Sequence, residues 1–119
     1  MLNTALNTHV ILVTGARTFT NEAAMRQTFA DAWRTWGPDT VTRPLLIAGH
    51  APKGADAMAE RLWKAEGFNA TIMPADWDKY GHRAGFLRNQ QMVDLAASLQ
   101  RSGAQVLCTP FLDYCLKPQ

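Results

Sequence analysis

The sequence has little cysteine, no long apolar run and only a small excess of positive charge. Its two cysteines, Cys108 and Cys115, match no zinc-ligand spacing, so we expect reduced thiols and no bound metal. No apolar run approaches the ~20 residues of a membrane span, and no basic segment precedes an apolar one at the amino end. These absences predict a cytoplasmic protein with no membrane segment.

The net charge of +2 is too small to indicate a nucleic-acid binder by itself. Cationic side chains are scattered along the chain, except in one segment that holds Lys79, Arg83 and Arg88. Those three residues leave DNA binding open as a minor alternative. Common hydrolase motifs are also lacking, because neither a Ser-His-Asp order nor an HExxH pattern is present.

At 119 residues, of which 47% are apolar, the chain has the size and composition of one domain with its own core. Short apolar runs alternate with helical patterns, which predicts the order βαβαβαβ. We therefore expect an α/β fold, a Rossmann-like three-layer sandwich with a mostly parallel four-stranded sheet. A polar tail is expected at residues 1–8 and an irregular tail at residues 110–119.

Strands are predicted at the short apolar runs of residues 10–13, 45–48, 70–73 and 106–108. Apolar residues at helical spacing predict helices that begin after Thr20 or Asn21, at Ala55 and near Gly85. Residues 75–84 are expected to form a polar and aromatic loop. No final helix follows the fourth strand, which predicts that a second copy of the chain covers the surface left open, giving a homo-oligomer.

Two glycine turns follow the first two predicted strands, and both open onto a helix. The first is Thr14-Gly15-Ala16-Arg17, and the second is Gly49-His50-Ala51-Pro52-Lys53-Gly54-Ala55-Asp56. In an open parallel sheet such turns lie side by side at the carboxyl ends of the strands, where ligands bind. Small residues, main-chain amides, a helix amino end and a cation suit a phosphate. We therefore expect one electropositive pocket, lined by main-chain amides, for a nucleotide-like ligand.

Several side chains near these turns have two roles open to them. Arg17 either binds a phosphate or is a solvated surface cation. Asp56 either accepts hydrogen bonds from ribose hydroxyls or favours the positive end of its helix. Trp77 and Tyr80 either stack on a base or seat their loop against the core. Asn89 hydrogen-bonds either a ligand or the neighbouring loop.

The second turn resembles an ATPase P-loop in spacing only. Ala55-Asp56 stands where the P-loop has Lys-Ser or Lys-Thr, which argues against Walker-type hydrolysis. Lys53 remains as a mobile point charge beside the turn. Asp56 and Asp76 are weak candidates for a catalytic pair of acids, and His82 is either a titrating group or a plain surface residue.

Four motifs occur in order along the chain: Val-Thr-Gly-Ala-Arg at 13–17, Gly-His-Ala-Pro-Lys-Gly-Ala-Asp at 49–56, Pro-Ala-Asp-Trp at 74–77 and Gly-Phe-Leu-Arg-Asn at 85–89. Together they resemble the YspA-like, cpYpsA-related branch of the SLOG superfamily, small Rossmann-like domains of bacteria and their phages. The resemblance covers residues 9–109 and implies a nucleotide or nucleotide-derived ligand. It also implies ligand contacts at Gly15, Arg17, Gly49, Gly54, Asp56, Arg88 and Asn89.

Relatives in the wider superfamily include the Lonely Guy phosphoribohydrolases, which release bases from nucleoside monophosphates, and the DprA-type DNA-binding proteins. The hydrolases carry a Pro-Gly-Gly-x-Gly-Thr turn after the fourth strand, followed by a catalytic Glu. Here the fourth strand runs into Cys108-Thr109-Pro110-Phe111-Leu112-Asp113 instead. The sequence therefore favours a sensor or sequestering module that needs no cofactor. An N-glycosidase that uses Asp56 or Asp76 and a DprA-like DNA binder are the alternatives.

Overall fold

The sheet at the centre of the protein has four strands in the order β3-β2-β1-β4. The computed structural model describes residues 8–111. The elements along the chain are β1 (His9–Gly15), α1 (Glu22–Trp36), η2 (Pro38–Thr40), β2 (Pro44–Gly49), α2 (Ala55–Ala65), β3 (Asn69–Met73), α3 (Trp77–Tyr80), η3 (Gly81–Arg83), α4 (Ala84–Arg101) and β4 (Gln105–Phe111). The predicted alternation of strands and helices is confirmed, and all neighbouring strands are parallel.

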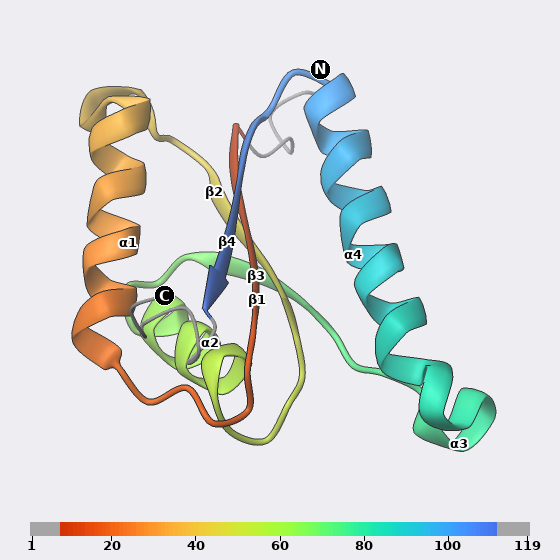
Figure 1. The fold of residues 1–119 in the computed structure, drawn as a ribbon. Helices are drawn as coiled ribbons and strands as arrows, with labels where there is room; N and C mark the ends of the chain where they lie inside the picture. Colours follow the sequence, from red (N-terminus) through yellow and green to blue (C-terminus); the bar gives the residue numbers. More distant parts are fainter. Residues whose placement is uncertain (1–7, 112–119) are drawn as a thin grey trace, which may run out of the picture.

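Helices cover both faces of the sheet, α1 and α2 on one face and α4 on the other (Figure 1). The chain moves from β1 through β2 to β3 in one direction and then returns across the sheet to β4. Right-handed crossovers therefore place α4 opposite the first two helices. The predicted Rossmann-like three-layer architecture is confirmed. Within the described part of the chain, no helix combines the length and the apolar character needed to cross a membrane.

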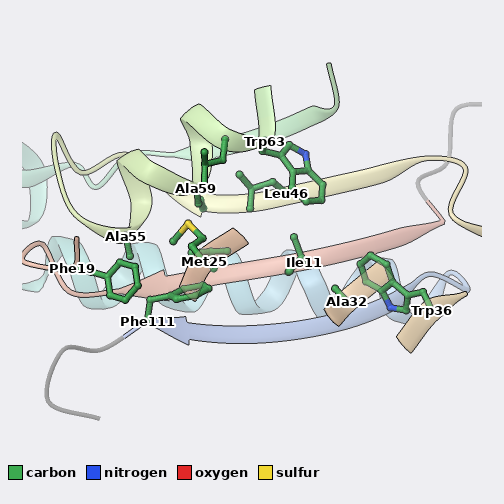
Figure 2. Close-up of a cluster of buried hydrophobic side chains, with 13 residues drawn as sticks. Ile11, Phe19, Met25, Ala32, Trp36, Leu46, Ala55, Ala59, Trp63 and Phe111 are labelled. Carbon is green, nitrogen blue, oxygen red and sulfur yellow. The ribbon is translucent and has the colours of Figure 1, made fainter. Parts of the chain in front are cut away.

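The apolar runs of β1 and β2 are buried because helices cover them on both sides. Ile11 and Val13 belong to the core beneath α1 and α2. Figure 2 shows Ile11 in this core together with Met25 of α1. Val10 and Leu12 point the other way, into the core beneath α4. A strand buried on both faces needs apolar residues at every position, and this explains the continuous run in the sequence.

The first long helix begins at a residue that the sequence indicates. Asn21, rather than Thr20, caps it, because its side chain accepts a hydrogen bond from the amide of Ala24 at 3.0 Å. Glu22 follows in the first turn, where a negative charge favours the helix dipole. Gly37 ends the helix with a φ of +93°, a conformation that glycine adopts without strain.

The prediction of a loop over residues 75–84 is wrong, because most of this segment is helical. Asp76 caps α3 by accepting a hydrogen bond from the amide of Lys79 at 3.1 Å. The turn η3 then leads directly into α4, which begins at Ala84 rather than Gly85. A helix as short as α3 shows no apolar period, so a search for periodicity does not reveal it.

The fourth strand is longer than its apolar run indicates. β4 reaches Phe111, so residues 110 and 111 belong to the sheet and not to the predicted irregular tail. Gln105 donates to the carbonyl oxygen of Thr8, and the carbonyl oxygen of Phe111 accepts from Ala16, so alternate residues of β4 bond to β1. Pro110 lies between them, where its missing N–H faces the free edge of the sheet. Residues 1–7 and 112–119, with the rest of both predicted tails, lie outside the described residues.

Candidate ligand-binding site

The turns that follow β1 and β2 meet directly, as the sequence predicts. The amide of Ala55 donates a hydrogen bond to the carbonyl oxygen of Ala16 at 3.1 Å. Gly54 lies so close to the backbone of Ala16 and Arg17 that a Cβ at this position would overlap both. The two glycine turns therefore form one continuous surface at the carboxyl end of the sheet.

The space between the ends of β1 and β4 is filled by packed groups. A Cβ on Gly15 would lie 2.5 Å from the carbonyl oxygen of Phe111 and 2.6 Å from the Cβ of Ala55. The rings of Phe19 and Phe111 lie 5.2 Å apart at the same end of the sheet (Figure 2). Glycine at position 15 is thus required for the packing of these segments. Open α/β sheets often bind ligands where the connections diverge, between β1 and β4 here, but this protein has its pocket toward β2 and β3.

Several main-chain amides of the two turns are engaged within the protein, so the expectation of an amide-lined pocket is wrong for them. The amide of Ala16 donates to the carbonyl oxygen of Phe111 at 2.9 Å, and the amide of Ala55 donates to Ala16. The amide of Ala51 donates to the carboxylate of Asp56. Positive charge for an anion therefore comes from side chains and from the amino end of α2, which no side chain caps.

A pocket of about 290 Å³, which we call the strand-end pocket, opens at the carboxyl ends of the strands. It is lined by Arg17, His50, Ala51, Pro52, Pro74, Ala75, Trp77 and Arg88. These residues come from the segments that follow β1, β2 and β3, and from α3 and α4. Arg17, Trp77 and Arg88 are among the predicted ligand-binding residues, and the fold brings them together.

Arg88 reaches from α4 across the ends of β2 and β3. Its Nη1 donates to the carbonyl oxygen of Met73 at 3.3 Å, and its Nε donates to Oδ1 of Asn89 at 2.8 Å. A Cβ on Gly49 would overlap the guanidinium, so glycine allows Arg88 to lie against the end of β2. Asn89 does not line the strand-end pocket. It acts instead by orienting Arg88. A planar guanidinium held by two hydrogen bonds suits an anionic ligand.

Asp56 is a buried carboxylate in the first turn of α2, only 7% exposed. Its Oδ2 lies 2.7 Å from the position that a Cβ on Gly49 would take, which places it beside the guanidinium of Arg88. Burial raises the pKa of Asp56, although the charge of Arg88 and the hydrogen bond from the Ala51 amide act in the opposite direction. A buried carboxylate with a raised pKa beside a cationic pocket is typical of a functional site.

Trp77 packs on α4 through one edge of its ring and is about half exposed. The ring lies 3.4 Å from the position that a Cβ on Gly85 would take, so it packs closely on the first turn of α4. Nearly half of the residue, 49%, is exposed, and the guanidinium of Arg17 lies 5.8 Å from the ring centroid. The geometry is thus compatible with both roles that the sequence leaves open for Trp77.

A second pocket of about 180 Å³, which we call the side pocket, adjoins the first. It is lined by Pro74, Asp76, Lys79, Tyr80, Ala84, Leu87, Arg88 and Gln91. Pro74 and Arg88 line both pockets. Sequence reasoning missed Pro74 and Gln91 as site residues. Position along α4, one turn beyond Arg88, is the signal that could have indicated Gln91.

In the turn between β2 and α2, the side chain that lines the strand-end pocket is not the one that the sequence predicts. Lys53 is exposed and lines neither pocket. His50, which sequence reasoning did not single out, lines the strand-end pocket, and its Nδ1 lies 3.7 Å from a carboxylate oxygen of Glu60. Its position directly after Gly49, the last residue of a buried strand, could have indicated it. His82 is exposed and lines neither pocket.

A larger pocket of about 340 Å³ lies between α1 and α2, away from the strand ends. It is lined by Arg26, Phe29, Ala30, Trp33, Leu62, Trp63, Glu66 and Phe68. Its rings pack on one another, as in the pair Trp33 and Phe68 at 5.4 Å, and its arginine is paired with Glu22 at 2.9 Å. Because its arginine is already paired, its other charged group is a carboxylate and its walls are largely apolar, we assign the candidate site to the strand ends.

A parallel sheet with a cationic and aromatic pocket at its strand ends defines this chain as a Rossmann-like α/β protein. The chain is 33% identical over 108 residues to the Gene 61 protein of Mycobacterium phage D29, a match that covers 85% of this chain and 74% of the phage protein. The chain belongs to the family of that phage protein. No protein-family model and no solved structure matches it.

Proposed function

We propose that the protein binds a nucleotide or a nucleotide-derived small molecule in the strand-end pocket. The observation that carries this proposal is the arrangement of Arg17, Arg88 and Trp77 around one pocket. Two guanidinium groups can pair with a phosphate, and the half-exposed ring of Trp77 can stack on a base. The positive end of α2 adds to the attraction for an anion. In this proposal the protein is a sensor or a sequestering module.

Asp56, in the first turn of α2, stabilises the position of Arg88 at the site. Its charge lies beside Arg88, and the amide of Ala51 holds its carboxylate in place. Asp56 is buried and lines neither pocket, so in this proposal it acts by holding Arg88 in place and not by contacting the ligand.

The resemblance to the YspA-like branch of the SLOG superfamily supports the same ligand class. Each of its four motif segments contributes to the lining of the strand-end pocket, through Arg17, through His50, through Pro74 and Trp77, and through Arg88. We therefore propose that the chain is a member of that branch. With a phage protein as a relative, we further propose that it acts in the cytoplasm of a bacterium, where nucleotides are abundant.

Isothermal titration calorimetry with AMP, ADP, ADP-ribose and NAD tests the proposal. We expect at least one of them to bind, and Arg88→Gln to weaken that binding at least tenfold, about 1.4 kcal/mol. Arg101→Gln, at the exposed last turn of α4, is the matched control and should bind as the wild type does. Absence of both binding and thermal stabilisation with every compound at millimolar concentration would contradict the proposal.

A second candidate function is hydrolysis of the N-glycosidic bond of a nucleotide. In this alternative Asp56, a buried carboxyl group beside Arg88, would protonate the departing base while water attacks the sugar carbon, and burial raises its pKa in the direction that this role needs. Asp76 is less suited to this role, because its carboxylate caps α3. Chromatography would detect free base released from AMP. If the wild type releases free base and Asp56→Asn does not, hydrolysis replaces binding as the proposed function. If neither protein releases free base, this candidate function is removed.

DNA binding has less support in the structure. Arg88 is turned into the pockets, where it bonds to Met73, and so it adds little to a surface patch with Arg83. Lys79 lies over the ring of Tyr80, 5.1 Å from its centroid. A gel shift at low salt that weakens steeply as salt is added would revive this alternative.

A further inference from the structure

The strand-end pocket and the side pocket share two lining residues, and we call the two pockets together the recess. Pro74 and Arg88 line both halves, and hydrogen bonds to Met73 and Asn89 fix the guanidinium. Pockets that bind small molecules have volumes of about 300–1,000 Å³. The strand-end pocket, at about 290 Å³, lies at the lower limit of this range and the side pocket, at about 180 Å³, lies below it, whereas the two together fall well within it.

Each half of the recess offers the same pair of groups, an aromatic ring with a cation over it. In the strand-end pocket Arg17 lies 5.8 Å from the centroid of Trp77. In the side pocket the ammonium of Lys79 lies 5.1 Å from the centroid of Tyr80. Trp77 and Tyr80 are the first and last residues of α3, so one short helix supplies a ring to each half. A repeated ring-and-cation arrangement fits a ligand with two ring-bearing halves.

We infer that the ligand is a dinucleotide, a molecule in which two ring-bearing halves are joined through phosphate. This inference rests on the proposed function and specifies its ligand. The linking phosphate lies at Arg88, one base stacks on Trp77, and the other ring stacks on Tyr80. A mononucleotide reaches only one of the two rings and leaves the other half of the recess to water.

The charges of the recess favour a phosphate at the junction rather than deep in the side pocket. Asp76 lines the side pocket, and its carboxylate accepts a hydrogen bond from the amide of Lys79 at 3.1 Å. A phosphate beside it would meet a like charge, whereas a sugar hydroxyl would find acceptors in Asp76 and Gln91. At the junction the carboxylate of Asp56 also lies beside Arg88, but it is buried and lines neither pocket. The groups that line the recess there are cationic, because Arg88 has Arg17 on one side and Lys79 on the other. The side pocket therefore takes the uncharged part of the second half.

Calorimetry with mononucleotides and dinucleotides tests the inference. NAD, whose halves are joined by a 5′–5′ diphosphate, and pApA, whose halves are joined 3′–5′, are compared with AMP and ADP. We expect at least one of the two dinucleotides to bind at least tenfold more tightly than either mononucleotide, because each further stacked ring strengthens binding about fivefold to a hundredfold. The tighter of the two identifies the linkage.

Substitution of Tyr80 separates the two halves of the recess. We expect Tyr80→Ala to weaken the dinucleotide at least tenfold and to leave ADP within about twofold of the wild type, while Tyr80→Phe restores tight binding. Phe86→Ala is the matched control, because Phe86 is an aromatic residue of α4 that is 77% exposed and lines neither pocket. Melting followed by circular dichroism confirms that each variant is folded.

Two results would overturn the inference and leave the proposed function standing. One is equal affinity for ADP and for both dinucleotides, and the other is an equal loss for ADP and the dinucleotide in Tyr80→Ala. If none of the four compounds binds and ADP-ribose does not bind either, the proposed function itself fails. The dinucleotide inference then fails as well. Binding of ADP or AMP distinguishes the two cases, because it shows that the proposed function holds even where the dinucleotide inference fails.

Discussion

Gly54 lies where the two turns of the site meet, and both its conformation and its surroundings require glycine. Its φ of +85° and ψ of −153° fall in a region that other residues hardly enter. A Cβ would also overlap the backbone of Ala16 and Arg17. Gly67 has a similar φ of +82°, but nothing lies within 4 Å of the position of its Cβ. A comparison of the two glycines thus contrasts a crowded position with an open one.

We predict that Gly54→Ala lowers the free energy of unfolding by about 3 kcal/mol, because strain and overlap add. Gly67→Ala should cost about 1 kcal/mol, because only strain acts there. Urea denaturation of both variants measures the difference. Gly54→Ala should also weaken nucleotide binding, since it forces the two turns apart. Equal losses of stability in the two variants would show that the contact of Gly54 with the first turn contributes nothing.

His9 is a buried histidine at the start of β1, with 4% of its surface exposed. Its ring lies 4.8 Å from that of Trp36, and its Nδ1 is 2.7 Å from the hydroxyl of Thr8. Its Nε2 is buried and has no hydrogen-bond partner among residues 8–111. Burial lowers the pKa of His9 below its usual value of 6.5. The folded state therefore favours the neutral ring.

The unfolded chain consequently binds more protons than the folded protein once the pH falls below about 6.5. We predict that the stability due to neutral His9 is complete above that pH and is lost as the pH falls toward the lowered pKa of the folded state. In His9→Phe the ring contact with Trp36 remains, and this loss is absent. Urea midpoints measured from about pH 7.5 to 5 should fall more steeply in the wild type. Parallel pH profiles for the two proteins would contradict the assignment.

At the scale of whole elements, those with a clear period or a continuous apolar run were predictable from the sequence. The apolar stripes of α1 and α2 and the cores of β1 and β2 reflect burial, and burial leaves a regular pattern. The short elements η2 and α3 were missed, because local caps and turns stabilise them and leave no period. The last residues of β4 were missed for another reason, because pairing with β1 holds Pro110 in the sheet.

The site was predictable only where its residues belong to the glycine turns or to the motif at the start of α4. Arg17 and Arg88 were found in this way, and the structure brings both to one pocket. The engagement of the Ala16 amide could not be foreseen, because its acceptor, Phe111, is remote in sequence and meets it only through the sheet. Pro74 was missed because its place at the site depends on the order of the strands.

The helix α3 carries both aromatic rings of the recess, and a side-chain cap stabilises its first turn. Asp76 accepts a hydrogen bond from the amide of Lys79, and such caps contribute about 1 kcal/mol. We predict that Asp76→Ala frays α3 and weakens nucleotide binding severalfold, while the Tm of the whole protein changes little. Hydrogen exchange at the amides of Lys79 and Tyr80 reports the fraying. Asp78→Ala, on the exposed side of the same helix, is the control.

If Asp76 acted only through its negative charge, the two variants would behave alike, because Asp78 also lies in the first turn. A similar loss of binding in both would therefore contradict the capping role. A large fall in the Tm of Asp76→Ala would also contradict it, since α3 lies at the margin of the fold, beside the first turn of α4 (Figure 1). The cap thus links one side chain to the placement of two binding groups.

At the scale of the whole molecule, the two faces of the sheet are covered unequally. α1 and α2 share one face, whereas α4 alone covers the other within the described part of the chain (Figure 1). β4 is an edge strand, and its Cys108 and Pro110 are exposed on the side of α4. Doubly wound domains usually place a further helix there. The absence of an N–H from Pro110 hinders pairing of another strand along this part of the edge.

We predict that a second copy of the chain covers this surface, so that the protein is a homodimer in solution, the commonest symmetry of oligomers. Sedimentation velocity should give twice the mass of 13.2 kDa calculated for one chain. Cys108→Glu places a charge in the contact and should yield monomers, because a buried unpaired charge is costly. Thr35→Glu, on the exposed surface of α1, should leave the dimer intact. A wild type that remains monomeric at the highest attainable concentration would contradict the prediction, and the open face beside α4 would then have to be stable in water.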